Sequence, residues 1–117
     1  MIPKHFTASV VTTAIESGVQ GIGYWASTRA YAWQGEDYAQ AVIMDKESER
    51  PHMYVLNHET IKAGIHMIMD KENEMDLDDS YRHAVRKAVL DYDAGQIDGD
   101  LADQIVQAAT LGDVIYG

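Results

Sequence analysis

The spacing of apolar residues changes twice along this chain, from a helical repeat to a strand-like alternation and back. The first repeat predicts an amphipathic helix over residues 5–17, ended by Gly18, and its apolar positions are Phe6, Val10, Val11, Ala14 and Ile15. From Ile22 to Trp33 the sequence becomes aromatic and loses the helical repeat, which predicts a strand. The chain must therefore combine helices with a sheet.

Two further strands follow at short intervals. Residues 34–37 predict a turn and residues 38–44 a second strand, and a charged turn over residues 45–51 leads to a third strand at residues 52–56. Three strands with short connections predict an antiparallel meander. In a regular first strand, alternate residues share one face, which groups Trp25, Ser27, Arg29, Tyr31 and Trp33.

The second half of the chain returns to helical spacing. Asn57 is expected to cap a helix with the buried stripe Ile61, Gly64, Ile65 and Ile68, and residues 70–79 form an exposed acidic linker. Asp79 or Ser80 is expected to cap a third helix. A last one carries Leu101, Ile105 and Ala108, ends at Gly112, and is followed by an apolar tail, residues 114–116, expected to pack back. The expectation is one α+β domain, residues 1–117, with an N-terminal helix, a three-stranded antiparallel meander and three C-terminal helices.

The net charge of −10 is unevenly distributed. Residues 1–44 carry a net −1, whereas residues 45–117 carry seven Lys or Arg against sixteen Asp or Glu, a net −9. Such a field repels nucleic-acid backbones, so direct DNA or RNA binding is not expected. The same field could imitate DNA and attract basic clefts of nucleic-acid enzymes.

The sequence lacks the residues that several kinds of functional site require. There is no cysteine, which excludes disulfides and thiolate sites and favours a reducing, cytoplasmic setting. No apolar run is long enough for a bilayer, and no signal-peptide layout begins the chain. The five histidines show no zinc-site spacing, and no serine lies in a nucleophile elbow. No membrane contact, metal, cofactor or enzymatic activity is expected.

The segment from Asp91 to Asp100 allows two interpretations. Its aspartates and glycines resemble an EF-hand loop one residue too short, because the glycine falls at position 5 and Ala102 stands at position 12. A weak calcium module is one reading. The favoured reading is that Asp91 and Asp93 end one helix, Gly95 turns the chain, and Asp98 or Asp100 caps the next helix.

The stretch from Tyr24 to Arg29 is the candidate ligand site. Aromatic rings stack on bases, and an arginine fork matches a phosphate group. We expect Tyr24, Trp25 and Arg29 to contact an anionic nucleotide if they face outward, and to belong to the core and its surface pairs otherwise. In the outward case, the remaining ligand contacts would come from Arg82, Arg86, Asp91 and Asp93, through a neighbouring helix or subunit.

Three segments carry a resemblance to known proteins. Gly21-Ile22-Gly23-Tyr24-Trp25-Ala26, the Asp-Ala-Gly linker before the last helix, and Gly112-Asp113-Val114-Ile115-Tyr116-Gly117 resemble small hypothetical proteins of bacteriophages. Among characterised phage proteins, the layout is most similar to the Thoeris anti-defence sponges. That resemblance implies an oligomeric α+β protein that sequesters cyclic-ADP-ribose-type signals between subunits in the host cytoplasm.

Two functions therefore compete at this point. The first is a non-enzymatic, homo-oligomeric antagonist of host defence that sequesters a small cyclic nucleotide at a subunit interface. The second is an acidic inhibitor or DNA mimic that docks on a basic host nucleic-acid enzyme, of the anti-CRISPR or anti-restriction type. The position of the acidic residues discriminates between them, because clustering on one face favours mimicry and scattering favours the sponge.

Overall fold

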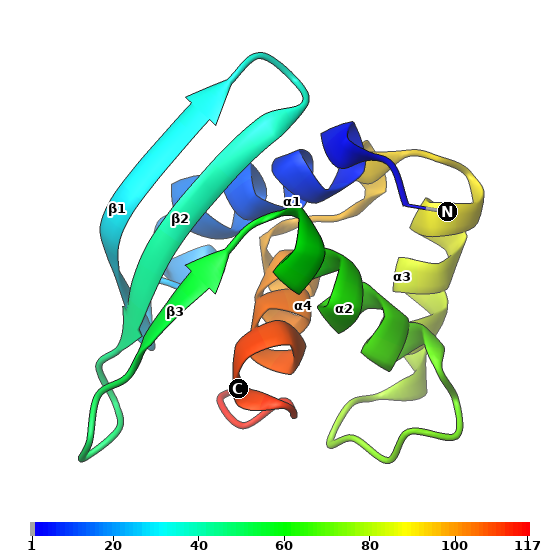
Figure 1. Cartoon of the computed structure of the whole chain (residues 1–117). Coiled ribbons are helices and arrows are strands. Elements are labelled where there is room, and N and C mark those ends of the chain that lie inside the picture. The colour runs from blue at the N-terminus through cyan, green and yellow to red at the C-terminus, as the bar shows by residue number, and fades with distance from the viewer. Residues whose placement is uncertain (1) are drawn as a thin grey trace.

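A computed structural model describes residues 2–117 and shows a helix, three strands and three further helices (Figure 1). The predicted α+β fold class is confirmed. None of the helices in residues 2–117 combines the length and apolar character needed to cross a membrane. The elements are α1 Lys4–Glu16, η1 Gly18–Gln20, β1 Ala26–Gln34, β2 Tyr38–Asp45, β3 Met53–Leu56, α2 His58–Met69, α3 Asp79–Leu90, η2 Ala94–Gln96 and α4 Gly99–Leu111.

The strands form an antiparallel sheet in the order β1-β2-β3, as the meander predicted. Its inner face carries Ala41, Ile43 and Leu56, all essentially inaccessible to solvent. Helix α1 packs against β2 on this side. Figure 1 shows α1 behind the sheet and the other helices to one side of it, so the opposite face of the sheet is open.

The face assignment predicted for β1 is wrong, because a bulge interrupts the strand at Arg29. Thr28 pairs with Ile43 and Ala30 pairs with Val42, so Arg29 has no partner in β2. A bulge residue reverses the alternation of faces beyond it. Tyr31 consequently shares the inner face with Ala41, opposite to the face that carries Ser27.

The predicted start of the first strand is also wrong. Residues 21–25 form turns, in which the Ile22 and Gly23 amides donate to the Ala14 and Gly18 carbonyls. The Trp25 amide donates to the Ile22 carbonyl. These bonds tie the segment to the end of α1, so its backbone is not available for a β ladder.

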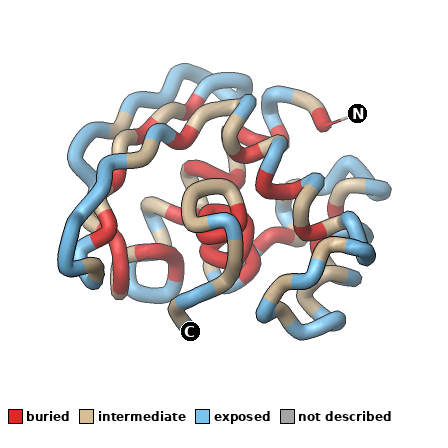
Figure 2. The backbone as a smooth tube through the Cα atoms, turned by 60° about the horizontal axis from the view of Figure 1, so that its bottom comes forward, coloured by how far each residue is buried: buried red, intermediate tan, exposed pale blue. Residues whose placement is uncertain are grey.

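Helix α4 is the centre of the molecule. Every residue from 101 to 108 is buried, and α4 packs against both α1 and α2 (Figure 2). Gly64 on α2 permits the close approach, because an added Cβ would lie 2.8 Å from the Ala109 Cβ and 2.8 Å from the Ile105 carbonyl oxygen. The buried surface of α4 is therefore wider than the three apolar positions Leu101, Ile105 and Ala108 indicated.

The segment between α3 and α4 has the predicted capping role. Asp91 is the C-cap of α3, Asp93 accepts from the Gly95 amide, and Asp98 caps α4 by accepting from the Leu101 amide at 2.9 Å. The chain turns at Tyr92, with a φ of 51°, and not at Gly95 as expected. The cap is thus confirmed, and the residue responsible for the turn is corrected.

We predict that Gly64→Ala destabilises the protein by about 1–3 kcal/mol, because the added methyl group overpacks the contact between α2 and α4. At a helix position with free space, the same change would stabilise by about 0.5–1 kcal/mol. Urea unfolding measures the difference. Ala63→Gly at the exposed neighbouring position is the control, with an expected loss of about 1 kcal/mol. A Gly64→Ala protein more stable than the wild type would contradict the close packing.

Candidate functional site

A buried carboxylate at Asp103 organises the region around the start of α4. Asp103 is 2% exposed and accepts hydrogen bonds from Trp25 Nε1 at 2.7 Å, the Tyr24 hydroxyl at 2.5 Å and Gln107 Nε2 at 3.0 Å. All three donors are neutral. Within residues 2–117, no Lys, Arg or His forms an ion pair with Asp103. Because buried charges are normally paired, this carboxylate is held by hydrogen bonds without a counter-ion.

The Asp103 carboxylate affects the ionisation of the Tyr24 hydroxyl. Burial, together with the hydrogen bond to Asp103 and its negative charge, raises the pKa of the Tyr24 hydroxyl well above its usual value. The hydroxyl therefore remains protonated and donates to Asp103 across the neutral range.

Gln107 fixes the C-terminal tail beside Asp103. Its Oε1 accepts from the amides of Ile115 and Tyr116, each at 2.8 Å, and its Nε2 donates to the Tyr116 carbonyl at 2.9 Å. The Tyr116 ring stacks on Trp25 with a centroid distance of 5.4 Å. The predicted packing of the tail against the core is confirmed.

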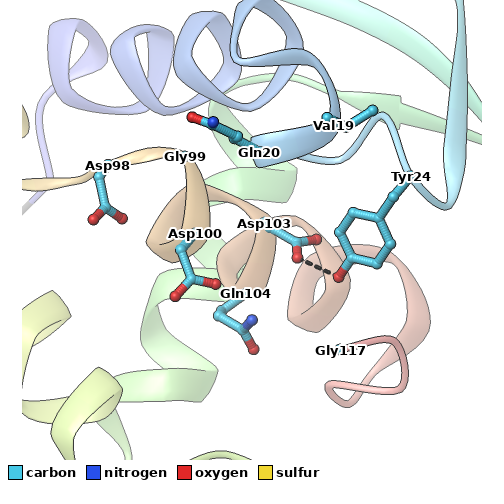
Figure 3. A pocket seen from close by; sticks show the side chains of 9 residues that line it. All are labelled: Val19, Gln20, Tyr24, Asp98, Gly99, Asp100, Asp103, Gln104 and Gly117. Atoms are coloured by element: carbon cyan, nitrogen blue, oxygen red, sulfur yellow. Dashed lines mark hydrogen bonds between the residues drawn. The ribbon is translucent and has the colours of Figure 1, made fainter.

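A pocket of about 580 Å³ opens beside this network (Figure 3). Three carboxylates contribute to it, from Asp98, Asp100 and Asp103, together with the Gln104 carboxamide and the Tyr24 ring. Figure 3 shows Asp98 just before α4, Asp100 and Asp103 on its first turns, and Tyr24 beside Asp103, at the end of the row away from Asp98. The remaining wall is formed by Val19, Gln20, Gly99 and Gly117.

The charged side chains that line the pocket are all acidic, because three aspartates contribute to it and no Lys, Arg or His does. Tyr81, beside it, donates to Asp100 at 2.6 Å, and this bond raises the pKa of the Tyr81 hydroxyl. The negative charges of Asp78 and Asp98 raise it further. Several acidic residues thus gather around the start of α4. The arrangement suits a ligand with positive charge and hydrogen-bond donors.

The aromatic residues of the predicted ligand site belong to the core. Trp25 is fully buried between Tyr116 and Asp103, so its ring is not available to stack on a base. That part of the expectation is corrected. Tyr24 is half-buried and does line a pocket, but the pocket is acidic.

Arg29 lies apart from the other two predicted arginines, Arg82 and Arg86, which both lie at the end of α2. Arg29 is exposed at the β1 bulge, and its guanidinium forms no hydrogen bond or ion pair within residues 2–117. Arg82 donates to the carbonyls of Ile68 and Asp70 at 2.7 and 2.6 Å, and to that of Asn73. The Arg86 guanidinium lies 3.5 Å from the Met69 carbonyl. Arg82 therefore satisfies the last carbonyls of α2, a structural role.

The predicted acidic contacts are likewise engaged in local structure. Asp91 accepts from Lys87 Nζ at 2.6 Å and from Gln96, which lowers the pKa of its carboxyl group, and Asp93 caps η2. The structure does not bring these residues to Tyr24 or Arg29 within one subunit. Their joint role in ligand binding across subunits stays a prediction.

The pocket residues of α4 were missed by sequence reasoning. The signal in the sequence is weak: Asp103, Gln104 and Gln107 interrupt an apolar run between Leu101 and Ala108. Polar residues inside a buried helix indicate a network or a site, but the sequence does not show that this side of the helix is buried.

Comparisons of the chain with known protein families, with curated proteins and with solved structures find no match. The function of the site is therefore inferred from its geometry and charge.

We predict that stability declines above pH 10 and that Tyr24→Phe makes the decline less steep. A raised pKa means that the folded state holds the Tyr24 proton more tightly, so the associated stability is complete below pH 10 and is lost at higher pH. At neutral pH the variant is less stable by about 1 kcal/mol, because it lacks one hydrogen bond.

Denaturant unfolding between pH 7 and 11.5 measures this effect, with Tyr92→Phe as an exposed control. The stabilities of wild type and Tyr24→Phe should converge as the pH rises. A constant difference over this range would show that Tyr24 ionisation is not linked to folding.

Proposed function

We propose that this protein is a non-catalytic binding protein that docks on a basic partner protein through the acidic pocket at the start of α4. The observation that carries the proposal is the lining of the pocket, with three aspartates and no basic residue. Basic surfaces are characteristic of enzymes that bind nucleic-acid backbones. The resemblance to phage proteins makes a host nucleic-acid enzyme the partner class that we propose.

The three aspartates that line one pocket support docking over the sponge. Asp78 also lies close enough to this region for its negative charge, with those of Asp98 and Asp100, to raise the pKa of the Tyr81 hydroxyl. An acidic cluster accelerates association with a basic surface and disfavours like-charged ligands. An anionic nucleotide would be repelled from this pocket.

The bonding of the carboxylates supports a binding role over a catalytic one. Asp98 caps α4, Asp100 accepts from Tyr81, and Asp103 is held by three donors. General acid–base catalysis requires a carboxyl group free to exchange a proton with a substrate. Both oxygens of Asp103 are occupied as acceptors, and one oxygen each of Asp98 and Asp100 is engaged in the same way.

We predict that the double variant Asp98→Asn/Asp100→Asn binds an octapeptide of alternating Arg and Lys about tenfold more weakly than the wild type. Asn is as good an N-cap as Asp, and its carboxamide oxygen can still accept from Tyr81, so the fold is retained while two charges are removed. Titration calorimetry at low and at physiological ionic strength measures the binding.

The control is Glu36→Gln/Asp37→Asn in the exposed turn between β1 and β2, which changes the net charge equally. We expect less than a twofold effect from this pair. Equal weakening by both double variants would mean that the overall charge binds the peptide and that the pocket is not the docking site.

A second function, sequestration of a cyclic nucleotide between subunits, is favoured by the open face of the sheet. Met53 is 61% and Val55 is 43% exposed on this face, and Arg29 is exposed on β1, the edge strand at the other side of the sheet. An uncovered apolar sheet face is a surface on which a second copy could pack. Arg29 would then contact a phosphate at that interface.

For this second function, Arg29→Ala should weaken nucleotide binding by roughly ten- to a hundredfold, the loss expected for a charge-assisted hydrogen bond. Thermal stability should barely change, because Arg29 has no partner within residues 2–117. Native mass spectrometry with cyclic dinucleotides, cyclic trinucleotides and cyclic-ADP-ribose isomers reports oligomer and ligand together. Arg50→Ala, at another exposed arginine, is the control. A monomer without bound nucleotide would exclude the sponge.

A further inference from the structure

Gln104 is a largely buried side chain whose amide group opens to the pocket. It is 7% exposed, yet its side chain forms no hydrogen bond with any of residues 2–117. It lines the acidic pocket one helical turn after Asp100, and Figure 3 shows its carboxamide beside the Asp100 carboxylate. The amide atoms of Gln104 are not sealed from solvent, because in residues 2–117 the fully buried side-chain polar atom without a partner is Ser27 Oγ. An amide held in a largely buried side chain, open to a pocket and free of protein partners, is available to a ligand.

The free atoms of the pocket are acceptors. One oxygen of Asp98 accepts from Leu101 and one oxygen of Asp100 accepts from Tyr81, which leaves the second oxygen of each carboxylate available. The Gln104 carboxamide can present its oxygen to the same space. With no basic residue in the lining, the complementary ligand is a cation that carries several donors.

The spacing of these acceptors selects among cations. Within residues 2–117, no three His, Asp or Glu side chains converge in a way that could hold a metal ion. A metal ion or an ammonium group needs acceptors that converge on one atom, whereas a guanidinium group spreads five donors over a planar fork. Separate acceptors around a pocket of about 580 Å³ therefore suit the wider group.

We propose that this pocket binds a guanidinium group, with the carboxylates of Asp98 and Asp100 and the Gln104 amide oxygen accepting its N–H donors. This inference rests on the docking function, because it names the group that the basic partner inserts. The Tyr24 ring forms a wall against which the guanidinium plane lies. Val19, 74% exposed at the pocket, covers the aliphatic stem.

The guanidinium group can come from an arginine of a protein or from a free small molecule. The pocket is larger than one arginine side chain, which leaves space for the adjoining peptide. Octa-arginine, octa-lysine, arginine amide and lysine amide are therefore the probes. Binding of arginine amide alone at the affinity of octa-arginine would assign the pocket to a small molecule, and a large gain with the peptide would assign it to a protein.

Calorimetry with the wild-type protein compares the two peptides at equal charge. We expect octa-arginine to bind about tenfold more tightly than octa-lysine, because only a guanidinium group can contact separate acceptors at once. Equal affinities, both weakened by Asp98→Asn/Asp100→Asn, would overturn the guanidinium assignment and leave the docking function intact. Binding of neither peptide would overturn both.

Gln104 supplies the second test. Gln104→Leu, of similar size, should lower the affinity for octa-arginine about tenfold and leave that for octa-lysine unchanged, whereas Gln104→Glu should keep the arginine preference. Equal thermal melting temperatures exclude a folding defect. In the wild type, arginine amide should shift the NMR signals of the Gln104 side-chain amide, and lysine amide should not. Unmoved signals with bound arginine amide would overturn the proposal without any variant.

Discussion

The carboxylate of Asp103 joins parts of the chain that are far apart in sequence. It holds the loop before β1 through Tyr24 and Trp25. It also receives a hydrogen bond from Gln107, which binds the C-terminal tail. Through that tail, the Tyr116 hydroxyl reaches Asp45 on β2 at 2.9 Å. One buried carboxylate thus connects the central helix, the entrance to the sheet and the end of the chain.

Burying a carboxylate without a counter-ion costs desolvation free energy, and hydrogen bonds from the surrounding residues offset only part of that cost. Three neutral donors satisfy the oxygens of Asp103, but the negative charge remains beside the pocket. The carboxylates of Asp98 and Asp100 add to the same potential. A fold that needs Asp103 for its packing therefore also produces a surface that attracts cations, and a bound cation would offset part of the desolvation cost.

The elements that could be predicted from sequence are those that depend on local spacing. The helix boundaries, the meander and the Asp98 cap follow from periodicity and cap chemistry within a few residues. The faces of β1 do not, because one bulge residue at Arg29 reverses the alternation and nothing in the local sequence marks it. The sequence around Trp25 is likewise typical of a strand, but the Trp25 backbone amide donates to the Ile22 carbonyl and forms a turn.

The candidate site depends on contacts that no local pattern contains. Gln104 and Gln107 lie three residues apart on one side of α4, and no sequence pattern distinguishes their roles. The tail returns to that side and hydrogen-bonds to both amide atoms of Gln107, whereas the Gln104 amide opens to the pocket and has no hydrogen-bond partner within residues 2–117. The position of the tail along α4 therefore decides that Gln107 has a structural role and that Gln104 remains available for the proposed ligand contact. The carboxylates beside Gln104 repel anions, and this is the reason for proposing a cationic donor as the group that completes its hydrogen bonding.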